Sequence, residues 1–482
     1  MNSLLFESPM DTEIIEDRKK TDTREKALRV NLDSAKYGAF AEIGAGQEVA
    51  RHFFKVGGAA GTVAKTMSAY DMTVSDSIYG PCQRYVSRER LEDMLKHEYD
   101  LLIERLRESR GKDSHFFAFA DTVKAKSYMA NDNSHGWMGI TFQSDAGAEP
   151  STIILHVTMW DNTNLQQQEA LGILGVNLIH GALYYKNDAS RVVRGLLDNL
   201  NSKRVEVDLI HFSGPDYPQL DNRLMALELV ENGLSNAATF NANGEVVQPA
   251  ELLYKKAVLV ERGSFRPITK ATMDMIKAAK SQFIQEPTVE NEPVVVLIEM
   301  TLHNLTDAGT IDHSDFLSRA DMLNALGHNV MISNYGTFHR LAAFLFQHTK
   351  KMIGLVLGVP SLREIFDPKY YTDLEGGILE SFGRLFKNDL KLYIYPQLGK
   401  IQGSLITAGN LRVAPNLRHL YAYLLENQYI HGLRDIDESC LPHYSRDALA
   451  KIAKGDDSWE NMVPELVAKM IKDNRSFGYT PK

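Results

Sequence analysis

The residues best suited to chemistry lie in one short stretch, VLVERGSFRPITKAT at residues 258–272. An apolar β-type run ends at Arg262-Gly263-Ser264, and a helix-type pattern begins after Pro267. Where a strand, a glycine turn and a helix N-terminus follow one another, backbone N–H groups and the helix dipole favour a bound anion. Arg266 and Lys270 add positive charge to the same stretch. The stretch therefore predicts a site for a ligand that carries phosphate.

The heptapeptide GSFRPIT at residues 263–269 is similar to the signature of the nicotinamide and nicotinate mononucleotide adenylyltransferases, within the nucleotidyltransferase superfamily. In that family a Gly-Ser/Thr-Phe-x-Pro turn follows the first strand of a Rossmann-like domain and cradles the triphosphate of ATP. A His-x-x-His or Thr-x-x-His element then opens the next helix. The resemblance implies that Thr269 takes the first place of this element and Thr272 the second. Threonine lacks the positive charge of a protonated imidazole, so the chain departs from the family where transfer needs charge stabilisation.

A second segment, ISNYGTFHR at residues 332–340, is loosely similar to a later Ser/Thr-rich element of the same family that ends in arginine at a helix start. The resemblance implies that Arg340 contacts phosphate and that ATP and Mg²⁺ are the cofactors. The first 250 residues match nothing in the family. The expected phosphate-binding residues are Arg262, Gly263, Ser264, Phe265, Arg266, Lys270, Ser333 and Thr337, and the expected catalytic residues are Thr269, Thr272 and Arg340.

Three functions are compatible with these residues. The first is a nucleotidyltransferase-like enzyme acting on a nucleotide or another phosphorylated small molecule, with adenylyl transfer from ATP to a mononucleotide as its specific form. The second is a non-catalytic nucleotide-binding or scaffold protein with a degenerate site, which Thr272 would mark. The third is a metal-assisted hydrolase that uses Asp161, Asp216 and His303, polar residues that follow predicted strands.

The elements that must position these residues alternate between strand and helix patterns after residue 151, which favours parallel strands joined by crossover helices. The apolar run VVVLI at 294–298 is typical of a strand buried on both faces. We expect an α/β protein with a doubly wound, mostly parallel Rossmann-like sheet; the alternation alone also permits a β/α barrel. Strands are expected at 152–160, 205–212, 257–260, 294–299, 329–333, 352–357 and 390–395, and helices at 316–326 and 338–348 among others.

Composition suggests four parts along the chain. Residues 1–25 are rich in charged residues and threonine without periodicity, which predicts a mobile leader. An N-terminal α+β domain is expected at 26–145, because the stretch SDAGAEPS at 144–151 has the composition of a linker. The Rossmann-like region is expected at 146–430, with its nucleotidyltransferase-like part at about 251–400, and a helical tail at 431–482.

Charge and cysteine content narrow the class of protein. With 53 basic and 62 acidic residues the formal net charge is −9, which disfavours nucleic-acid binding. The two cysteines, Cys82 and Cys440, lie outside any CxxC pattern, which fits a reducing compartment. No apolar run approaches the roughly 18 residues that span a membrane. We expect a cytoplasmic protein that binds neither nucleic acid nor membrane; a homo-oligomer would be usual for this class, although the sequence does not specify one.

Overall fold

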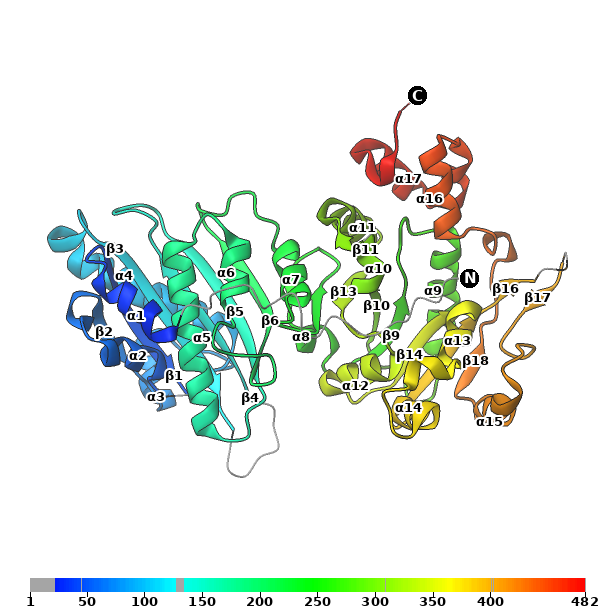
Figure 1. The fold of residues 1–482 in the computed structure, drawn as a ribbon, viewed down its shortest axis with the longest axis horizontal. Coiled ribbons are helices and arrows are strands. Elements are labelled where there is room, and N and C mark those ends of the chain that lie inside the picture. The colour runs from blue at the N-terminus through cyan, green and yellow to red at the C-terminus, as the bar shows by residue number, and fades with distance from the viewer. Residues whose placement is uncertain are drawn as a thin grey trace. The chain divides into compact units, whose positions relative to one another are not determined.

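The computed structural model describes residues 22–44, 46–126, 134–307, 309–399, 401 and 403–481 (Figure 1). The chain divides into two compact units, Met1–Leu220 and Asp221–Lys482. The first helix, α1 (Thr23–Leu32), has Asp22 as its N-cap, whose side chain accepts a hydrogen bond from the amide of Arg24. This helix begins inside the stretch 1–25 that composition assigns to a leader, and residues 1–21 of that stretch lie outside the described residues.

The first unit contains one mixed six-stranded sheet in the order β2-β1-β3-β4-β5-β6. β1 runs parallel to β2 and β3, and from β3 to β6 each strand runs antiparallel to the next. The carboxyl ends of the three parallel strands therefore share an edge with the start of β4 and the end of β5. The strands are β1 (Lys36–Ile43), β2 (Val63–Met67), β3 (His115–Lys124), β4 (Ser134–Phe142), β5 (Ser151–Met159) and β6 (Val205–Ser213).

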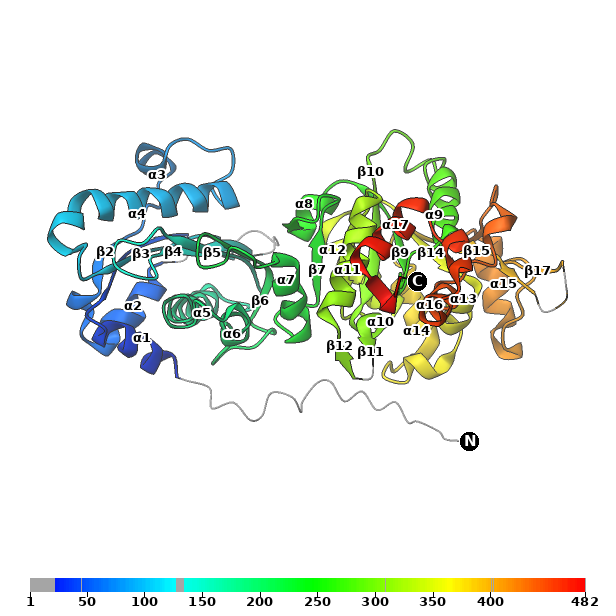
Figure 2. The same cartoon turned by 90° about the horizontal axis from the view of Figure 1, so that it is seen from above.

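Helices cover both faces of this sheet (Figure 2). On one face lie α1, α2 (Glu48–Val56), α5 (Asn164–Tyr184) and α6 (Ala189–Gly195), and on the other lie α3 (Met72–Tyr79) and α4 (Arg88–Arg110). Gly175 allows α5 to approach α2 closely, because an added Cβ would collide with the side chain of Val49. Within the described ranges, no helix of the protein is both long and apolar enough to cross a membrane.

The boundary between the two units lies later than composition indicates. β5 and β6, which we expected to open the Rossmann-like region, pair antiparallel within the first sheet. The stretch at 143–150 connects two neighbouring antiparallel strands instead of two domains, and Thr141 pairs with Thr152 across it, with 2.9 Å between their hydroxyl oxygens. The prediction that the strands at 152–160 and 205–212 are parallel is wrong, because strand and helix patterns alternate in a mixed sheet as well.

The second unit contains an open eight-stranded sheet in the order β18-β15-β14-β9-β10-β13-β7-β8. Its six strands from β13 to β18 are parallel, and β7 and β8 extend one edge with antiparallel pairing. By chain position the six parallel strands follow the order 3-2-1-4-5-6 of a doubly wound Rossmann sheet. The barrel alternative is wrong because the sheet does not close. The strands are β7 (Ala237–Phe240), β8 (Val246–Val247), β9 (Ala257–Arg262), β10 (Val294–Thr301), β13 (Asn329–Ser333), β14 (Ile353–Gly358), β15 (Leu390–Tyr395) and β18 (Ile430–Gly432).

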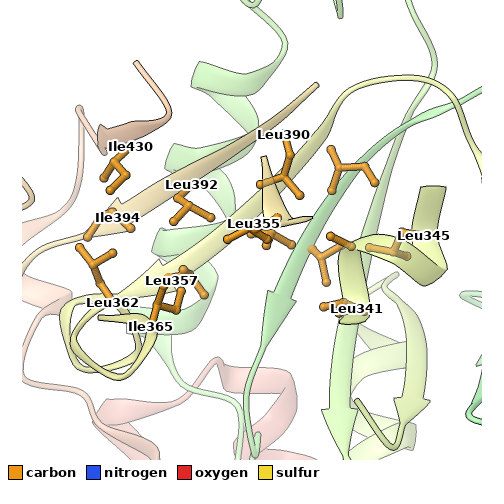
Figure 3. Packing of buried hydrophobic residues seen from close by; sticks show 14 of the residues in the cluster. Leu341, Leu345, Leu355, Leu357, Leu362, Ile365, Leu390, Leu392, Ile394 and Ile430 are labelled. Atoms are coloured by element: carbon orange, nitrogen blue, oxygen red, sulfur yellow. The ribbon is translucent and has the colours of Figure 1, made fainter. Parts of the chain in front are cut away.

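Alternating side chains of the central strand β9 face two separate cores. Leu259 packs with residues of α9 (Lys270–Phe283), such as Ala279 and Phe283. Val258 and Val260 point to the opposite face, where leucines of α12 (Phe338–His348) and α13 (Val359–Ile365) meet those of β14 and β15 (Figure 3). This burial on both faces explains why β9 and β10 are almost continuously apolar.

Shorter elements complete the second unit. After β18 the chain forms two further helices, α16 and α17, and Pro464 is the N-cap of α17. The remaining elements are α7 (Asn222–Glu231), α8 (Pro249–Leu253), α10 (Leu302–Leu305), α11 (His313–Ala325), α14 (Gly377–Leu385), α15 (Arg418–Glu426), α16 (Ser445–Lys454), α17 (Glu465–Asn474), β11 (Thr306–Asp307), β12 (Thr310–Ile311), β16 (Gln397–Leu398) and β17 (Leu405–Ile406).

We predict that Leu355→Ala lowers the free energy of unfolding of the second unit by about 2–5 kcal/mol, because it leaves a cavity in a packed core. Leu355 in β14 is 1% exposed. Leu379→Ala in α14 is the matched control, since Leu379 is 64% exposed and should change the same quantity by under about 0.5 kcal/mol. Urea unfolding of both variants measures the difference, and equal effects would contradict this placement of the core.

Candidate functional site

The predicted anion site lies where the order of the parallel strands reverses. β9 stands between β10 and β14, and Arg262 is its last residue. The turn at residues 263–269 then leads to α9, whose first residue is Lys270. In open α/β sheets this switch point, at the carboxyl ends of the strands, is where ligands bind. The strand, turn and helix predicted at 258–272 are therefore confirmed, and the turn lies at the expected place in the sheet.

The turn is held by its own side chains. The ring of the buried Phe265 folds back over Gly263, where an added Cβ would lie 2.9 Å from the ring, and the amide of Gly263 donates to the carbonyl of Glu299. Phe265 itself has a positive φ of 47°. Thr269 is 1% exposed and is the N-cap of α9, accepting a hydrogen bond from the amide of Thr272 at 3.5 Å. The structure thus gives Phe265 a packing role and Thr269 a capping role, which differ from the phosphate-binding and catalytic roles that the resemblance implies.

Arg262 pairs with a fully buried carboxylate. Its Nε and Nη2 each donate to Glu299 of β10 at 2.8 Å, and the guanidinium lies 4.4 Å from the ring centroid of Phe338. Ser333, at the end of β13, donates to the same carboxylate at 2.5 Å. Because Glu299 has 0% side-chain exposure, it needs this charge and these hydrogen bonds. The structure brings Arg262 and Ser333 together around Glu299, whereas the sequence predicts that both hold phosphate.

Arg266 also forms an ion pair with a carboxylate. Its Nε donates to Asp315 of α11 at 2.8 Å, and its backbone amide donates to Ser445 of α16 at 3.1 Å. Asp315 additionally pairs with the buried Arg319, which donates to the carbonyl of Ser264 at 3.1 Å. These contacts fasten the turn to α11 and α16. Arg266 therefore has a structural partner, whereas the sequence predicts that it holds phosphate.

The second motif divides: Ser333, Gly336 and Phe338 contact Arg262 or its partner Glu299, whereas Arg340 forms its ion pair elsewhere. Arg340 lies on α12 with its side chain 58% exposed, in an ion pair of 2.9 Å with Asp373. Thr337 is the N-cap residue of α12, and its buried hydroxyl oxygen has no hydrogen-bond partner among the described residues. The predicted helix at 338–348 is confirmed as α12, but no hydrogen bond links Arg340 or Thr337 to the turn in the described chain.

The first turn of α9 has the groups that bind anions at helix N-termini, namely backbone amides unpaired within the helix and a lysine beside them. The amides of Lys270 and Ala271 have no partner within the helix, because they precede its first hydrogen bonds. The amide of Thr272 donates to the side chain of Thr269. Lys270 is half-buried, and its charge helps to lower the pKa of His443, after the larger effect of burial. His443 and Ser445 thus come to the site from a segment some 170 residues away in sequence. No local pattern marks them, and sequence reasoning missed both.

One acidic side chain of β9 was also missed. Glu261 is 3% exposed, and its Oε2 has no hydrogen-bond partner among the described residues. Its register neighbours are Ile298 of β10 and Val356 of β14, both apolar. Burial raises the pKa of Glu261 well above its ordinary value, which favours the protonated carboxyl group. The available signal was a single acid at the end of the apolar run AVLV.

The residues of the metal-dependent alternative do not form a site. Asp161 is paired with Arg204 at 2.8 Å, and both Asp161 and Asp216 belong to the first unit, whereas His303 belongs to the second. Across the described residues, no three His, Cys, Asp or Glu side chains lie close enough to hold a metal ion. The hydrolase hypothesis therefore gains no support from these three residues.

Comparisons with known proteins add distant likenesses. No protein-family model matches the sequence, and no curated protein matches it. Among solved structures, the chain is similar to the competence/damage-inducible protein CihA from Agrobacterium tumefaciens, at 17% identity and a TM-score of 0.24 over 33% of this chain and 94% of that chain. It is also similar to a competence-damaged protein (CinA) superfamily protein from Enterobacter cloacae, at 14% identity and a TM-score of 0.27 over 36% of this chain and 99% of that chain. A third similar structure is a provisionally designated nicotinate-nucleotide adenylyltransferase from Vibrio parahaemolyticus, at 12% identity and a TM-score of 0.21 over 47% of this chain and 97% of that chain. At these values the likenesses assign no function, which depends on the geometry of the site.

We predict that Arg262→Ala lowers the free energy of unfolding by about 3–5 kcal/mol, because it leaves the buried carboxylate of Glu299 without its cation. Arg340→Ala is the matched control. Its partner Asp373 is 55% exposed, so loss of that ion pair should cost under about 1 kcal/mol. Urea unfolding compares the two variants, and a small effect of Arg262→Ala would show that the pair does not hold the strand ends together.

We predict that Glu261→Gln stabilises the protein increasingly as pH rises. The folded-state pKa of Glu261 lies above its unfolded value of about 4.3, so its stability contribution is complete below that pH and is lost as pH rises through the folded-state pKa. The difference in unfolding free energy between variant and wild type should grow by up to roughly 1.4 kcal/mol per pH unit. Urea unfolding between pH 5 and 9 tests this, with Glu290→Gln at an exposed glutamate as the control. A difference that is constant with pH would refute the assignment.

Proposed function

We propose that the second unit binds a nucleotide or another phosphorylated small molecule at the carboxyl end of β9. The observation that carries this proposal is the position of the turn at 263–269, which follows the central strand beside β14, at the switch point of a 3-2-1-4-5-6 sheet. α9 begins at this turn and runs for 14 residues. Its N-terminal amides and Lys270 supply the positive potential that a phosphate group needs.

Adenylyl transfer from ATP to a mononucleotide is the more specific form of the proposal. Its support is the GSFRPIT turn between a central strand and a helix, the arrangement that the mononucleotide adenylyltransferases use. In this form Lys270 would contact a phosphate, and Thr272 would donate a hydrogen bond without supplying charge. Mg²⁺ would arrive with the triphosphate, since it keeps water and phosphate ligands and needs few from protein.

A binding or scaffold role without catalysis is the second candidate. The observation that favours it is that both arginines already form ion pairs, Arg262 with Glu299 and Arg266 with Asp315. Charge stabilisation is the main demand of nucleotidyl transfer, and these two cations are already engaged. Phosphate binding by Lys270 and the helix N-terminus remains compatible with this arrangement.

Two measurements on the full chain separate these candidates. A thermal shift with ATP, nicotinate mononucleotide or pyrophosphate is expected under both, because ligand that binds the native state raises its stability. Pyrophosphate release from ATP plus mononucleotide is expected only from the enzyme. Binding without release would favour the non-catalytic role, and the absence of any shift with all three ligands would overturn the proposed function.

We predict that Lys270→Ala weakens binding of pyrophosphate by about tenfold, the loss expected for one charge-assisted hydrogen bond. Lys277→Ala provides the control, since Lys277 lies two turns further along α9 and is exposed. Isothermal titration calorimetry of the two variants measures the dissociation constants. Equal dissociation constants for both variants and wild type would place the phosphate elsewhere.

A further inference from the structure

A chain of hydrogen-bonded side chains crosses three strands of the first unit. Nδ1 of His135 in β4 lies 3.1 Å from Nε2 of His156 in β5, and Nδ1 of His156 lies 2.6 Å from Oδ1 of Asp208 in β6. Thr158 donates to the second oxygen of Asp208 at 3.0 Å. Trp137 packs edge-on against His156, with 4.9 Å between the ring centroids. The middle imidazole is therefore held on both nitrogens and on its ring edge.

The backbone of β6 is shaped to place Asp208 in this chain. The register pairs His156 with Leu209 and the next residue, Val157, with Val207, so Asp208 is the extra residue of a β-bulge. A bulge turns one side chain away from the regular alternation of the strand. Here it directs a carboxylate to His156, which is fully buried, whereas Asp208 is 8% exposed. A buried carboxylate and imidazole are costly unless each has a partner, so the bulge and the pair depend on each other.

One assignment of the protons satisfies both hydrogen bonds with an uncharged imidazole in the middle. An ionised Asp208 can only accept, so Nδ1 of His156 carries a proton. When His156 is uncharged, its Nε2 is an acceptor, and Nδ1 of His135 donates to it. The proton of His135 is thus on Nδ1, and its Nε2 presents a lone pair. In the described part of the chain this Nε2 has no hydrogen-bond partner, and His135 is only half-buried.

His135 lies at the edge of the sheet where ligands are expected. It pairs in register with Lys124 at the carboxyl end of β3 and with Thr158 near the end of β5. The carboxyl ends of the parallel strands β1 and β2 share this edge. Burial and the neighbouring His156 lower the pKa of His135 to about 4, so its ring is uncharged at neutral pH. Lys124 adds positive charge beside it.

We infer that the first unit carries a second ligand site, in which Nε2 of His135, held open by Asp208 through His156, accepts the proton of a hydroxyl group on an anionic small molecule or of a water beside it. On proton uptake Nε2 gains the N–H bond and the oxygen keeps the electron pair. The ring then becomes an imidazolium whose Nδ1–H still donates to His156, and the Asp208 carboxylate partly offsets the new charge. This arrangement, a base oriented by a second group that a carboxylate orients in turn, is one that activates hydroxyl groups and water in enzymes. The site is independent of the nucleotide site proposed for the second unit.

The tautomers can be measured directly on the full chain. Two-bond ¹H–¹⁵N correlation spectra of the histidine-labelled protein distinguish the Nδ1–H from the Nε2–H form, and His135→Gln and His156→Gln identify the two signals. We expect both rings in the Nδ1–H form at neutral pH. An Nε2–H form of His135, or a doubly protonated His156, would overturn the inference, because either leaves no lone pair on Nε2 of His135.

A chemical probe tests the same lone pair. Diethyl pyrocarbonate acylates a free imidazole nitrogen: an N–C bond forms, ethyl carbonate leaves with the C–O electron pair, and the Nδ1 proton passes to His156. In Asp208→Asn the new side chain can donate its N–H to His156, and this arrangement reverses both tautomers and closes Nε2 of His135. The acylation rate of His135, relative to the exposed His303, should fall by at least about tenfold.

Thr158→Val is the matched control, since it removes a hydrogen bond from Asp208 but leaves both histidine contacts in place. Its His135 should be acylated at a rate close to that of wild type. Equal rates in wild type and in a folded Asp208→Asn whose spectra show His156 in the Nε2–H form would overturn the inference. If Asp208→Asn does not fold, the tautomers of the wild-type protein decide the question alone.

Discussion

The buried carboxylate of Glu299 holds the carboxyl ends of three neighbouring strands together. It belongs to β10, receives two hydrogen bonds from Arg262 at the end of β9, and one from Ser333 at the end of β13. An ion inside a sheet is costly unless its partners are in place, so this pair requires the three strand ends to stay in register. The turn at 263–269 begins at Arg262. Its position at the switch point of the sheet therefore depends on the pair.

This constraint decides which residues are available for a ligand. The same arginine cannot fully neutralise Glu299 and also supply its charge to a phosphate. Arg266 has a similar commitment to Asp315, which fastens the turn to α11. The capacity to bind an anion then rests with Lys270 and the first amides of α9. These ion pairs therefore favour phosphate binding over transfer chemistry, for which Thr272 lacks the charge of a histidine.

Local patterns predicted local structure well. The strands at 329–333 and 390–395 are found as β13 and β15, since short, mostly apolar runs between turns have few alternatives. The roles of the arginines were not predictable, because Glu299 and Asp315 lie 37 and 49 residues from their partners. The domain boundary was misplaced because a polar hairpin connection has the composition of a linker. The hydrogen-bonded series His135–His156–Asp208 was not predictable either, because its members lie far apart in the sequence. Three strands and a bulge bring them together.

Hydrogen–deuterium exchange of the full chain, with and without pyrophosphate, tests the central claim most directly. A bound phosphate group would engage the amides at the start of α9 and slow their exchange. The account predicts protection concentrated in the peptide that covers residues 263–273, with little change in β13 or on α12 near Arg340. Protection elsewhere, with unchanged exchange at 263–273, would contradict a phosphate site at the end of β9.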